Sequence, residues 1–316
     1  MTTPQSNGSA PTTATNGASA STSTSAEPFL PDTHLSLPAL CAHIHNRVQA
    51  FLSSSPSTPL IERCQAQTRT TLGVIREALD RYALNELALS YNGGKDCLIL
   101  LLLYLASLHQ HPHLTTAALQ SVYITPPSPF PEVESFVAHT STTYSLSLTR
   151  YALPMRAAFT AYLEQHSHVK AILVGTRRTD PHGAQLTFFD RTDHGWPDFM
   201  RVHPVIDWHY VDVWTFIRAL NVPYCPLYDQ GYTSLGGTDD THRNPALART
   251  LPAPDASAPA TAFAPAYELV DDEAERLGRD WASDRKKLWT VEGGVKEVVV
   301  GTQKGDEEEG DGTSEI

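Results

Sequence analysis

The spacing of apolar residues changes along the chain and predicts two kinds of element. Over residues 37–82, apolar side chains recur every three or four positions, which is typical of amphipathic helices. Further along, short apolar runs predict strands, and the stretches between them predict helices. The predicted strands are 86–90, 119–125, 144–151 and 169–175, and the helices between them are 98–108, 131–144 and 153–167. This alternation favours βαβ units, so we expect an α/β fold with an open, mostly parallel sheet and helices on both faces.

The rest of the chain has a different texture. A long polar segment follows Gly175, then a helix is predicted over residues 210–220, then a stretch rich in turn residues. We expect the domain organisation to be a disordered tail (1–33), a nucleotide-binding catalytic domain (34–250), an Ala/Pro-rich insertion or linker (251–266), a C-terminal extension (267–290) and an acidic disordered tail (300–316).

Composition narrows the function classes. The chain has 316 residues and a formal net charge of −12, which argues against general binding to nucleic acid or to anionic membranes. Its four cysteines form no CxxC pair, so a disulfide framework or structural zinc site is not expected. Neither a membrane span nor a targeting signal is recognisable, and a cytoplasmic location is the expectation. A monomer is compatible with these features.

The stretch "SYNGGKDC", from Ser90 to Cys97, connects the first predicted strand with an almost wholly apolar helix. In an open parallel sheet, ligands bind where such loops leave the strands. Glycine N–H groups and the helix N-terminus can approach a phosphate, and Lys95 adds a full positive charge. Asn92 and Asp96 offer oxygen ligands to Mg²⁺. A simple tight turn is the alternative, but it leaves the two charged residues unexplained. The Walker A pattern does not match.

Two other segments offer groups for a phosphate. "GTRRTDP" follows the fourth strand and places Arg177, Arg178 and Asp180 at the same edge of the sheet. In "ERLGR", Arg276 and Arg279 are three residues apart and would share a face of a helix. Solvated charged surfaces explain both segments nearly as well on spacing alone. The sequence supports neither a zinc site nor a Ser-His-Asp or Cys-His arrangement.

Together, several motifs resemble the eukaryotic FAD synthase family, of the monofunctional FMN adenylyltransferase type found in fungi. The similar stretches are "SYNGGKDC", "SPFPEVESF", "GTRRTDP", "RTDHGWPDFMRVHPVIDWHYVDVW", "VPYCPLYDQGYTSLGGT", "NPAL" and "PAYELVDDEAERLGR". The first of these resembles the PP-loop of ATP pyrophosphatases and alone points only to that superfamily. The FAD synthase family that all the stretches resemble belongs to its PAPS-reductase-like branch. The resemblance implies transfer of AMP from ATP to FMN, giving FAD and pyrophosphate with Mg²⁺.

The resemblance also implies residue roles. The ATP site would comprise Ser90, Tyr91, Asn92, Gly93, Gly94, Lys95, Asp96, Ile124 and Gly175. Catalysis would involve Asn92, Lys95, Asp96, Arg177 and Asp180, with the metal held by Asn92, Asp96 and Asp180. FMN would contact Arg178, Asp193, Trp196, Asp198, Arg201, Tyr232, Arg276 and Arg279.

Three rival functions share parts of this pattern. A PAPS reductase needs a reactive cysteine near the C-terminus, and no cysteine follows Cys225. A sulfate-adenylating enzyme would not need "ERLGR". A nucleotide-binding module without catalysis would not need Lys95 and Asp96 intact.

Overall fold

The computed structural model describes residues 1, 28–109, 111, 114, 118–250 and 261–279. Residues 2–27 of the predicted N-terminal tail, the predicted acidic tail and most of the Ala/Pro-rich segment therefore lie outside the described residues. Residues 28–33 of the predicted N-terminal tail are described, and Phe29 there is buried in the core. No helix within the described part is long and apolar enough to cross a membrane.

A six-stranded sheet forms the centre of the fold, in the order β3-β2-β1-β4-β6-β5. Its strands are β1 (Leu87–Ser90), β2 (Leu119–Ile124), β3 (Leu146–Tyr151), β4 (Ala171–Leu173), β5 (Phe189–Arg191) and β6 (Met200–Val202). All neighbours are parallel except β5, which pairs antiparallel with β6 at the edge. The predicted mostly parallel sheet is confirmed. The order reverses beside β1, so the loops after β1 and β4 open onto one crevice.

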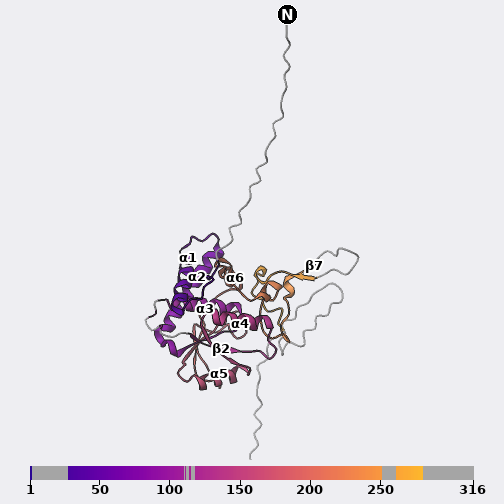
Figure 1. Ribbon diagram of the computed structural model, residues 1–316. Coiled ribbons are helices and arrows are strands. Elements are labelled where there is room, and N and C mark those ends of the chain that lie inside the picture. Colours follow the sequence, from indigo (N-terminus) through magenta and orange to yellow (C-terminus); the bar gives the residue numbers. More distant parts are fainter. Residues whose placement is uncertain (2–27, 110, 112–113, 115–117, 251–260, 280–316) are drawn as a thin grey trace, which may run out of the picture.

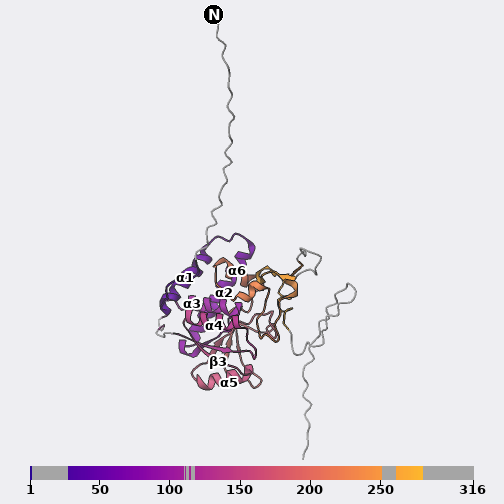
Figure 2. The ribbon, with the colours of Figure 1, turned by 45° about the vertical axis from the view of Figure 1, so that its right-hand side comes forward.

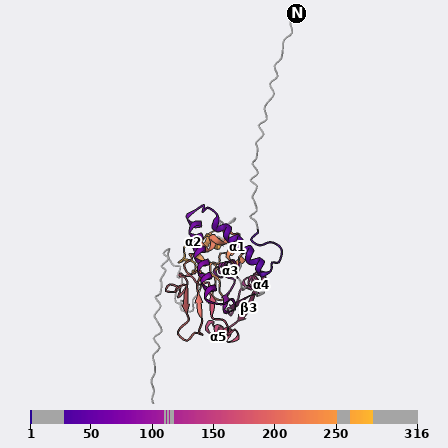
Figure 3. The ribbon, with the colours of Figure 1, turned by 90° about the vertical axis from the view of Figure 1, so that its left-hand side faces the viewer.

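Helices cover both faces of the sheet unequally (Figures 1 and 3). One face carries α1 (Leu37–Ser53), α2 (Pro59–Arg81), α3 (Lys95–Ser107), α4 (Pro131–Thr143) and α6 (Tyr210–Ala219), and the other carries α5 (Met155–Gln165). The larger core lies under the first group, while a smaller cluster that includes Phe159 lies under α5.

Helix α3 lies at the centre of the larger core. Leu98 to Ala106 are all buried, because α1, α2 and α6 pack on the side of α3 away from the sheet. A helix that is apolar on all sides needs such complete cover. It begins at Lys95, three residues before the predicted start, so the Gly-Gly turn leads directly into the helix N-terminus.

The chain after α6 is mostly irregular and occupies one side of the domain (Figure 2, orange). It contains short 3₁₀ turns at Pro226–Gln230, Pro245–Leu247 and Ala266–Glu268, and a small hairpin of β7 (Ala248–Thr250) and β8 (Thr261–Phe263). Another 3₁₀ turn, Leu84–Glu86, directly precedes β1. Residues 264–279, named here the C-terminal arm, run in turns back to the sheet edge. The prediction that Arg276 and Arg279 share a helix face is wrong, because the described arm contains no α-helix.

Candidate active site

The PP-loop, residues 90–97, leaves β1 at the crevice and turns sharply into α3. Gly93 has φ +74°, and a Cβ there would lie 2.7 Å from Val137 Cγ2, so the turn requires glycine. The Gly94 N–H donates to Asn92 Oδ1 at 2.9 Å, and the Lys95 N–H donates to the Tyr228 hydroxyl at 2.9 Å. Side chains from two parts of the chain therefore hold the loop in one shape.

The arginine loop, residues 175–181, follows β4 and touches the PP-loop. A Cβ on Gly175 would lie 2.9 Å from Cys97 Sγ and 3.0 Å from the Cys97 nitrogen. Asp180 Oδ2 accepts the Arg177 N–H at 2.9 Å, which closes the turn. The two motifs, which the sequence places at the same edge of the sheet, are thus in contact.

The C-terminal arm is fixed over this crevice by main-chain contacts. The Thr233 hydroxyl donates to the Glu275 carbonyl at 2.6 Å, and the buried Asn244 amide donates to the Ala274 carbonyl at 2.7 Å. Asp272 accepts the Tyr210 N–H at 2.5 Å at the start of α6. A segment distant in sequence thereby becomes part of the site.

These three segments meet in a cluster of buried charges. Lys95 Nζ lies 3.1 Å from Asp96 Oδ2 and 2.5 Å from Glu275 Oε1. Arg177 Nε lies 2.8 Å from Asp96 Oδ1, and the same guanidinium pairs with Glu275. Lys95 is 2% exposed and Arg177 is fully buried. Arg276 Nη1 joins the cluster 3.3 Å from Asp180 Oδ1.

The cluster shifts the acidities of its members. Burial alone would raise the pKa of Asp96, but the charges of Arg177 and Lys95 outweigh it and hold the pKa below its ordinary value. Burial and the Asp96 charge raise the pKa of Asp180. Burial opposes the charged form of Arg177, yet Asp96 and Glu275 raise its pKa above the usual value. The site therefore holds two fixed cations, Lys95 and Arg177, among carboxylates. Of these carboxylates, Asp180 is the one whose ionised form is disfavoured.

The second arm arginine lies beside a glycine turn. Arg279 Nη2 is 2.9 Å from Asp240 Oδ2, and its Nη1 donates to the Leu235 carbonyl at 3.1 Å. A Cβ on Gly236 would lie 2.3 Å from Arg279 Nη2, so this glycine makes room for the guanidinium. The "SLGGT" stretch and the "ERLGR" stretch are therefore structural partners.

Most of the residues predicted to bind ATP lie on the loops at the carboxyl edge of the sheet, where their side chains make different contacts. Asn92 forms the turn through its side-chain oxygen. The Tyr91 side chain is buried and donates to Thr140 Oγ1 at 2.9 Å, and the Tyr91 N–H donates to the Val122 carbonyl at 3.0 Å. Ser90 ends β1 and Ile124 ends β2, both at the carboxyl edge of the sheet.

The residues predicted to contact FMN are spread more widely. The Arg178 guanidinium bonds Asp207 and the carbonyls of Ala184 and Leu186, and so holds its own loop. The Tyr232 ring packs edge to face on Phe130 with 5.4 Å between centroids. These contacts do not test a role toward FMN, and both roles remain predictions.

Asp193, Trp196 and Asp198 lie in the loop between β5 and β6, which leaves the sheet at the edge opposite the PP-loop. The Trp196 ring packs on Phe159 of α5, and Asp198 forms an exposed ion pair with Arg191. Arg201 on β6 reaches the Asp190 carbonyl at 3.5 Å. The structure thus does not bring this group into the charge cluster, and its FMN contacts remain predictions.

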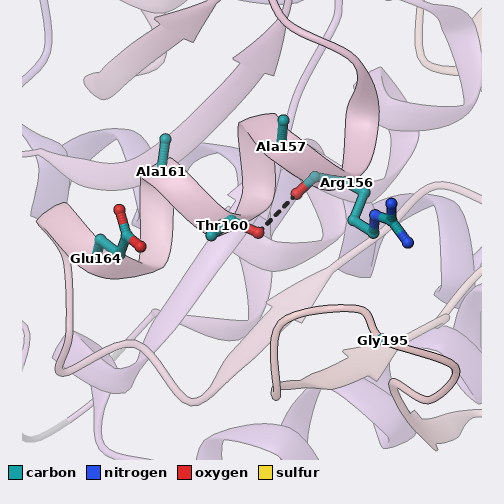
Figure 4. Close-up of a pocket in the computed structure, with 6 residues that line it drawn as sticks. All are labelled: Arg156, Ala157, Thr160, Ala161, Glu164 and Gly195. Carbon is teal, nitrogen blue, oxygen red and sulfur yellow. Dashed lines mark hydrogen bonds between the residues drawn. The ribbon is translucent and has the colours of Figure 1, made fainter. Parts of the chain in front are cut away.

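A hollow of about 360 Å³ lies where this loop meets α5 (Figure 4). Its lining residues are Arg156, Ala157, Thr160, Ala161, Glu164 and Gly195. All but Gly195 come from α5, and none belongs to the PP-loop, the arginine loop or the C-terminal arm. It is therefore separate from the buried charge cluster.

Sequence reasoning missed three groups of the site. Tyr228 accepts a hydrogen bond from the PP-loop. Asp272 of the C-terminal arm lies near Arg177, and Glu275 pairs with Lys95. The sequence contains a partial indication of Glu275, since it directly precedes the predicted site residue Arg276. Its partners Lys95 and Arg177 are 180 and 98 positions away, a separation that spacing rules do not address.

Fold and site together define an α/β nucleotide-binding protein of the PP-loop class. Residues 153–243 match the phosphoadenosine phosphosulfate reductase domain family. The chain is 42% identical over 234 residues to a probable FAD synthase of Schizosaccharomyces pombe, which covers 73% of this chain and 84% of the relative.

Two solved structures of Candida glabrata FMN adenylyltransferase are also similar. The complex with FMN and the ATP analogue AMPCPP has a TM-score of 0.72 and 30% identity, and covers 79% of this chain and 99% of that chain. The complex with FAD and inorganic pyrophosphate has a TM-score of 0.70 and 30% identity, and covers 78% and 100%. The chain belongs to the FAD synthase family.

Proposed function

We propose that the protein transfers the AMP moiety of ATP to FMN, forming FAD and pyrophosphate, the last step of FAD biosynthesis. The observation that carries this is the meeting of two cationic segments. The C-terminal arm brings Arg276 to Asp180, beside the PP-loop and the arginine loop. One set of cations suits a triphosphate and the other suits a second phosphate next to it.

ATP is held by the PP-loop and by the cations that face it. The N-terminus of α3 supplies partial positive charge, and Lys95 supplies a full charge beside it. Arg177 presents a second fixed cation from the arginine loop. Their burial makes them strong partners for phosphate oxygens, because charge interactions strengthen where water is excluded.

FMN presents its phosphate to the arm. Arg276 and Arg279 both lie on this segment, and the relative bound to FMN and AMPCPP supports placing the two substrates in one site. The other residues predicted to bind FMN, which are Arg178, Asp193, Trp196, Asp198, Arg201 and Tyr232, remain part of this proposal. The flavin would have to extend away from the charge cluster toward α5 for the β5–β6 loop to reach it.

Asn92, Asp96 and Asp180 are the residues that would hold Mg²⁺, and of these Asn92 already accepts the Gly94 N–H through Oδ1. No group of three or more His, Cys, Asp or Glu side chains in the described residues makes a metal site by itself. Mg²⁺, however, commonly uses one or two carboxylates together with substrate phosphates. The fit rests on two carboxylates close enough that the Asp96 charge raises the pKa of Asp180, although Asp96 Oδ1 also pairs with Arg177 Nε at 2.8 Å. When bound, the ion would neutralise developing charge on the phosphates.

The reaction needs positioning more than acid–base chemistry. An oxygen of the FMN phosphate attacks the α-phosphorus of ATP, the new P–O bond forms, and the bond to the pyrophosphate oxygen breaks. A phosphate monoester is already an anionic nucleophile, so no general base is required. Lys95, Arg177 and Arg276 hold the reacting phosphates in line, and such orientation supplies on the order of 7–11 kcal/mol.

The cysteines disfavour a thiol-based reductase. Burial raises the pKa of Cys41, Cys64 and Cys97 to about 12 and that of Cys225 to about 11. None of these thiols is a thiolate nucleophile at neutral pH, as sulfur chemistry at a reductase centre would require. This supports a nucleotidyl transfer over the reductase alternative.

The test is pyrophosphate release from ATP and Mg²⁺ with FMN, riboflavin or sulfate as acceptor, together with FAD formation by chromatography. We expect equal amounts of FAD and pyrophosphate with FMN alone. Asp180→Asn keeps the shape of the turn but removes a carboxylate, and should lower kcat/KM by about 10²-fold. Turnover with sulfate and not with FMN would contradict the flavin assignment.

A further inference from the structure

Like Asp96, Glu275 contacts both buried cations of the cluster, Lys95 and Arg177. It is 3% exposed, lies 2.5 Å from Lys95 Nζ through Oε1, and pairs with the Arg177 guanidinium through Oε2. The two cations come from different loops, so a single carboxylate fixes their relative position.

We propose that Glu275 is a positioning residue, which acts through Lys95 and Arg177 and not by touching the reacting atoms. The inference rests on the proposed function and adds a residue to its machinery. Asp96 is the other carboxylate that both cations contact, and it is also one of the groups suited to a metal ion. Glu275 is then the contact that keeps the two cations in place whatever Asp96 binds.

The local geometry separates this role from anchoring of the C-terminal arm. The Glu275 carbonyl accepts from the Thr233 hydroxyl at 2.6 Å and from Asn244 Nδ2 at 3.3 Å. These bonds use the main chain, and they survive replacement of the side chain. Tyr210 and Tyr228 rings lie near Lys95 Nζ at 5.1 and 6.0 Å and restrict where the ammonium can move.

Positioning of this kind changes rate more than ground-state binding. Glu275→Gln keeps the size and one acceptor of the side chain but removes the charge that attracts both cations. A misplacement of about 1 Å costs on the order of 10²-fold in rate. We therefore expect kcat to fall by about 10²-fold while KM for ATP changes by less than about threefold.

The experiment compares wild type, Glu275→Gln, Glu275→Asp and the control Glu273→Gln in full-length protein. Glu273 is an exposed neighbour on the same arm. FAD formation gives kcat and KM, thermal unfolding checks the fold, and AMPCPP titration without Mg²⁺ gives nucleotide affinity independently of turnover. Glu275→Asp should recover at least tenfold of the rate lost by Glu275→Gln, and Glu273→Gln should match wild type.

The outcomes are distinguishable. If wild type makes no FAD from FMN, the proposed function fails. If wild type is active and Glu275→Gln retains its kcat within about twofold, the positioning role is wrong. A loss confined to KM and AMPCPP affinity, or an equal loss in Glu275→Asp and Glu275→Gln, would also overturn it, because either result would assign Glu275 to ground-state binding or to packing.

Discussion

Single atoms decide how closely the PP-loop and the arginine loop approach each other. Gly175→Ala would place a methyl group 2.9 Å from Cys97 Sγ and 3.0 Å from its main-chain nitrogen. Because main chain cannot move aside as a flexible side chain can, the two loops must separate. We expect kcat for FAD formation to fall by about 10²-fold, with a measurable loss of AMPCPP affinity in a titration.

A matched glycine provides the control. Gly73 is exposed in the middle of α2, and a Cβ there meets nothing within 4 Å. Gly73→Ala should leave kcat unchanged and stabilise the protein by about 1 kcal/mol, since alanine is the better helix former. If both alanine variants lost activity to the same degree, close approach at Gly175 would not be the cause.

At the residue scale, the sequence identifies the groups better than their partners. Lys95, Asp96, Arg177 and Asp180 were predicted because their types and loop positions suit phosphate and metal. Glu275 was not predicted as part of the site, because its role depends on a long-range fold of the C-terminal arm. Local pattern contains no information about such a contact until the path of the chain is known.

Helices and strands were predictable where the apolar residues followed one clear helical or strand pattern. The strand at 119–125 and the helix at 131–144 correspond closely to β2 and α4, and Pro131 does begin the helix. The β5–β6 hairpin was missed, because its strands have three residues each and carry polar side chains. The terminal arginines were assigned to a helix although turns fix their positions through Asp180 and Asp240.

The apolar helix α3 gives a prediction at the element scale. Leu101 is fully buried between the sheet and the outer helices. Leu101→Ala would leave a cavity that rigid neighbours on both sides cannot close, and should cost about 2–5 kcal/mol of unfolding free energy. Urea unfolding measures this, with Leu60→Ala on the exposed side of α2 as the comparison. A loss of unfolding free energy below about 1 kcal/mol would mean that the helix is not packed as described.

At the scale of the whole molecule, the C-terminal arm makes the site a joint product of distant segments. It supplies Asp272, Glu275 and Arg276 to the charge cluster at the loops after β1 and β4, and Arg279 to the glycine turn at Gly236. Catalytic competence therefore depends on the arm being docked. Ala264, Ala266 and Leu269 of the same arm are buried in the larger core, so undocking the arm should also lower stability.

Stability toward acid is a property of the whole fold that His203 should influence. Burial lowers the pKa of His203, which is 1% exposed and lies 3.0 Å from the Thr187 carbonyl through Nδ1. A histidine with a depressed folded-state pKa favours the folded state above its unfolded pKa of about 6.5. That contribution is lost as pH falls through the folded value, by at most about 1.4 kcal/mol per pH unit.

His203→Gln should therefore flatten the fall in stability below about pH 6.5. Glutamine can still donate to the Thr187 carbonyl but does not titrate. The folded variant therefore does not have to bury a positively charged imidazolium at acidic pH. Thermal unfolding measured from about pH 7.5 down to about pH 5 gives the slope of stability against pH for each protein. His194→Gln is the control, because that side chain is 89% exposed. An unchanged slope in His203→Gln, or an equal flattening in His194→Gln, would show that acid sensitivity arises elsewhere in the molecule.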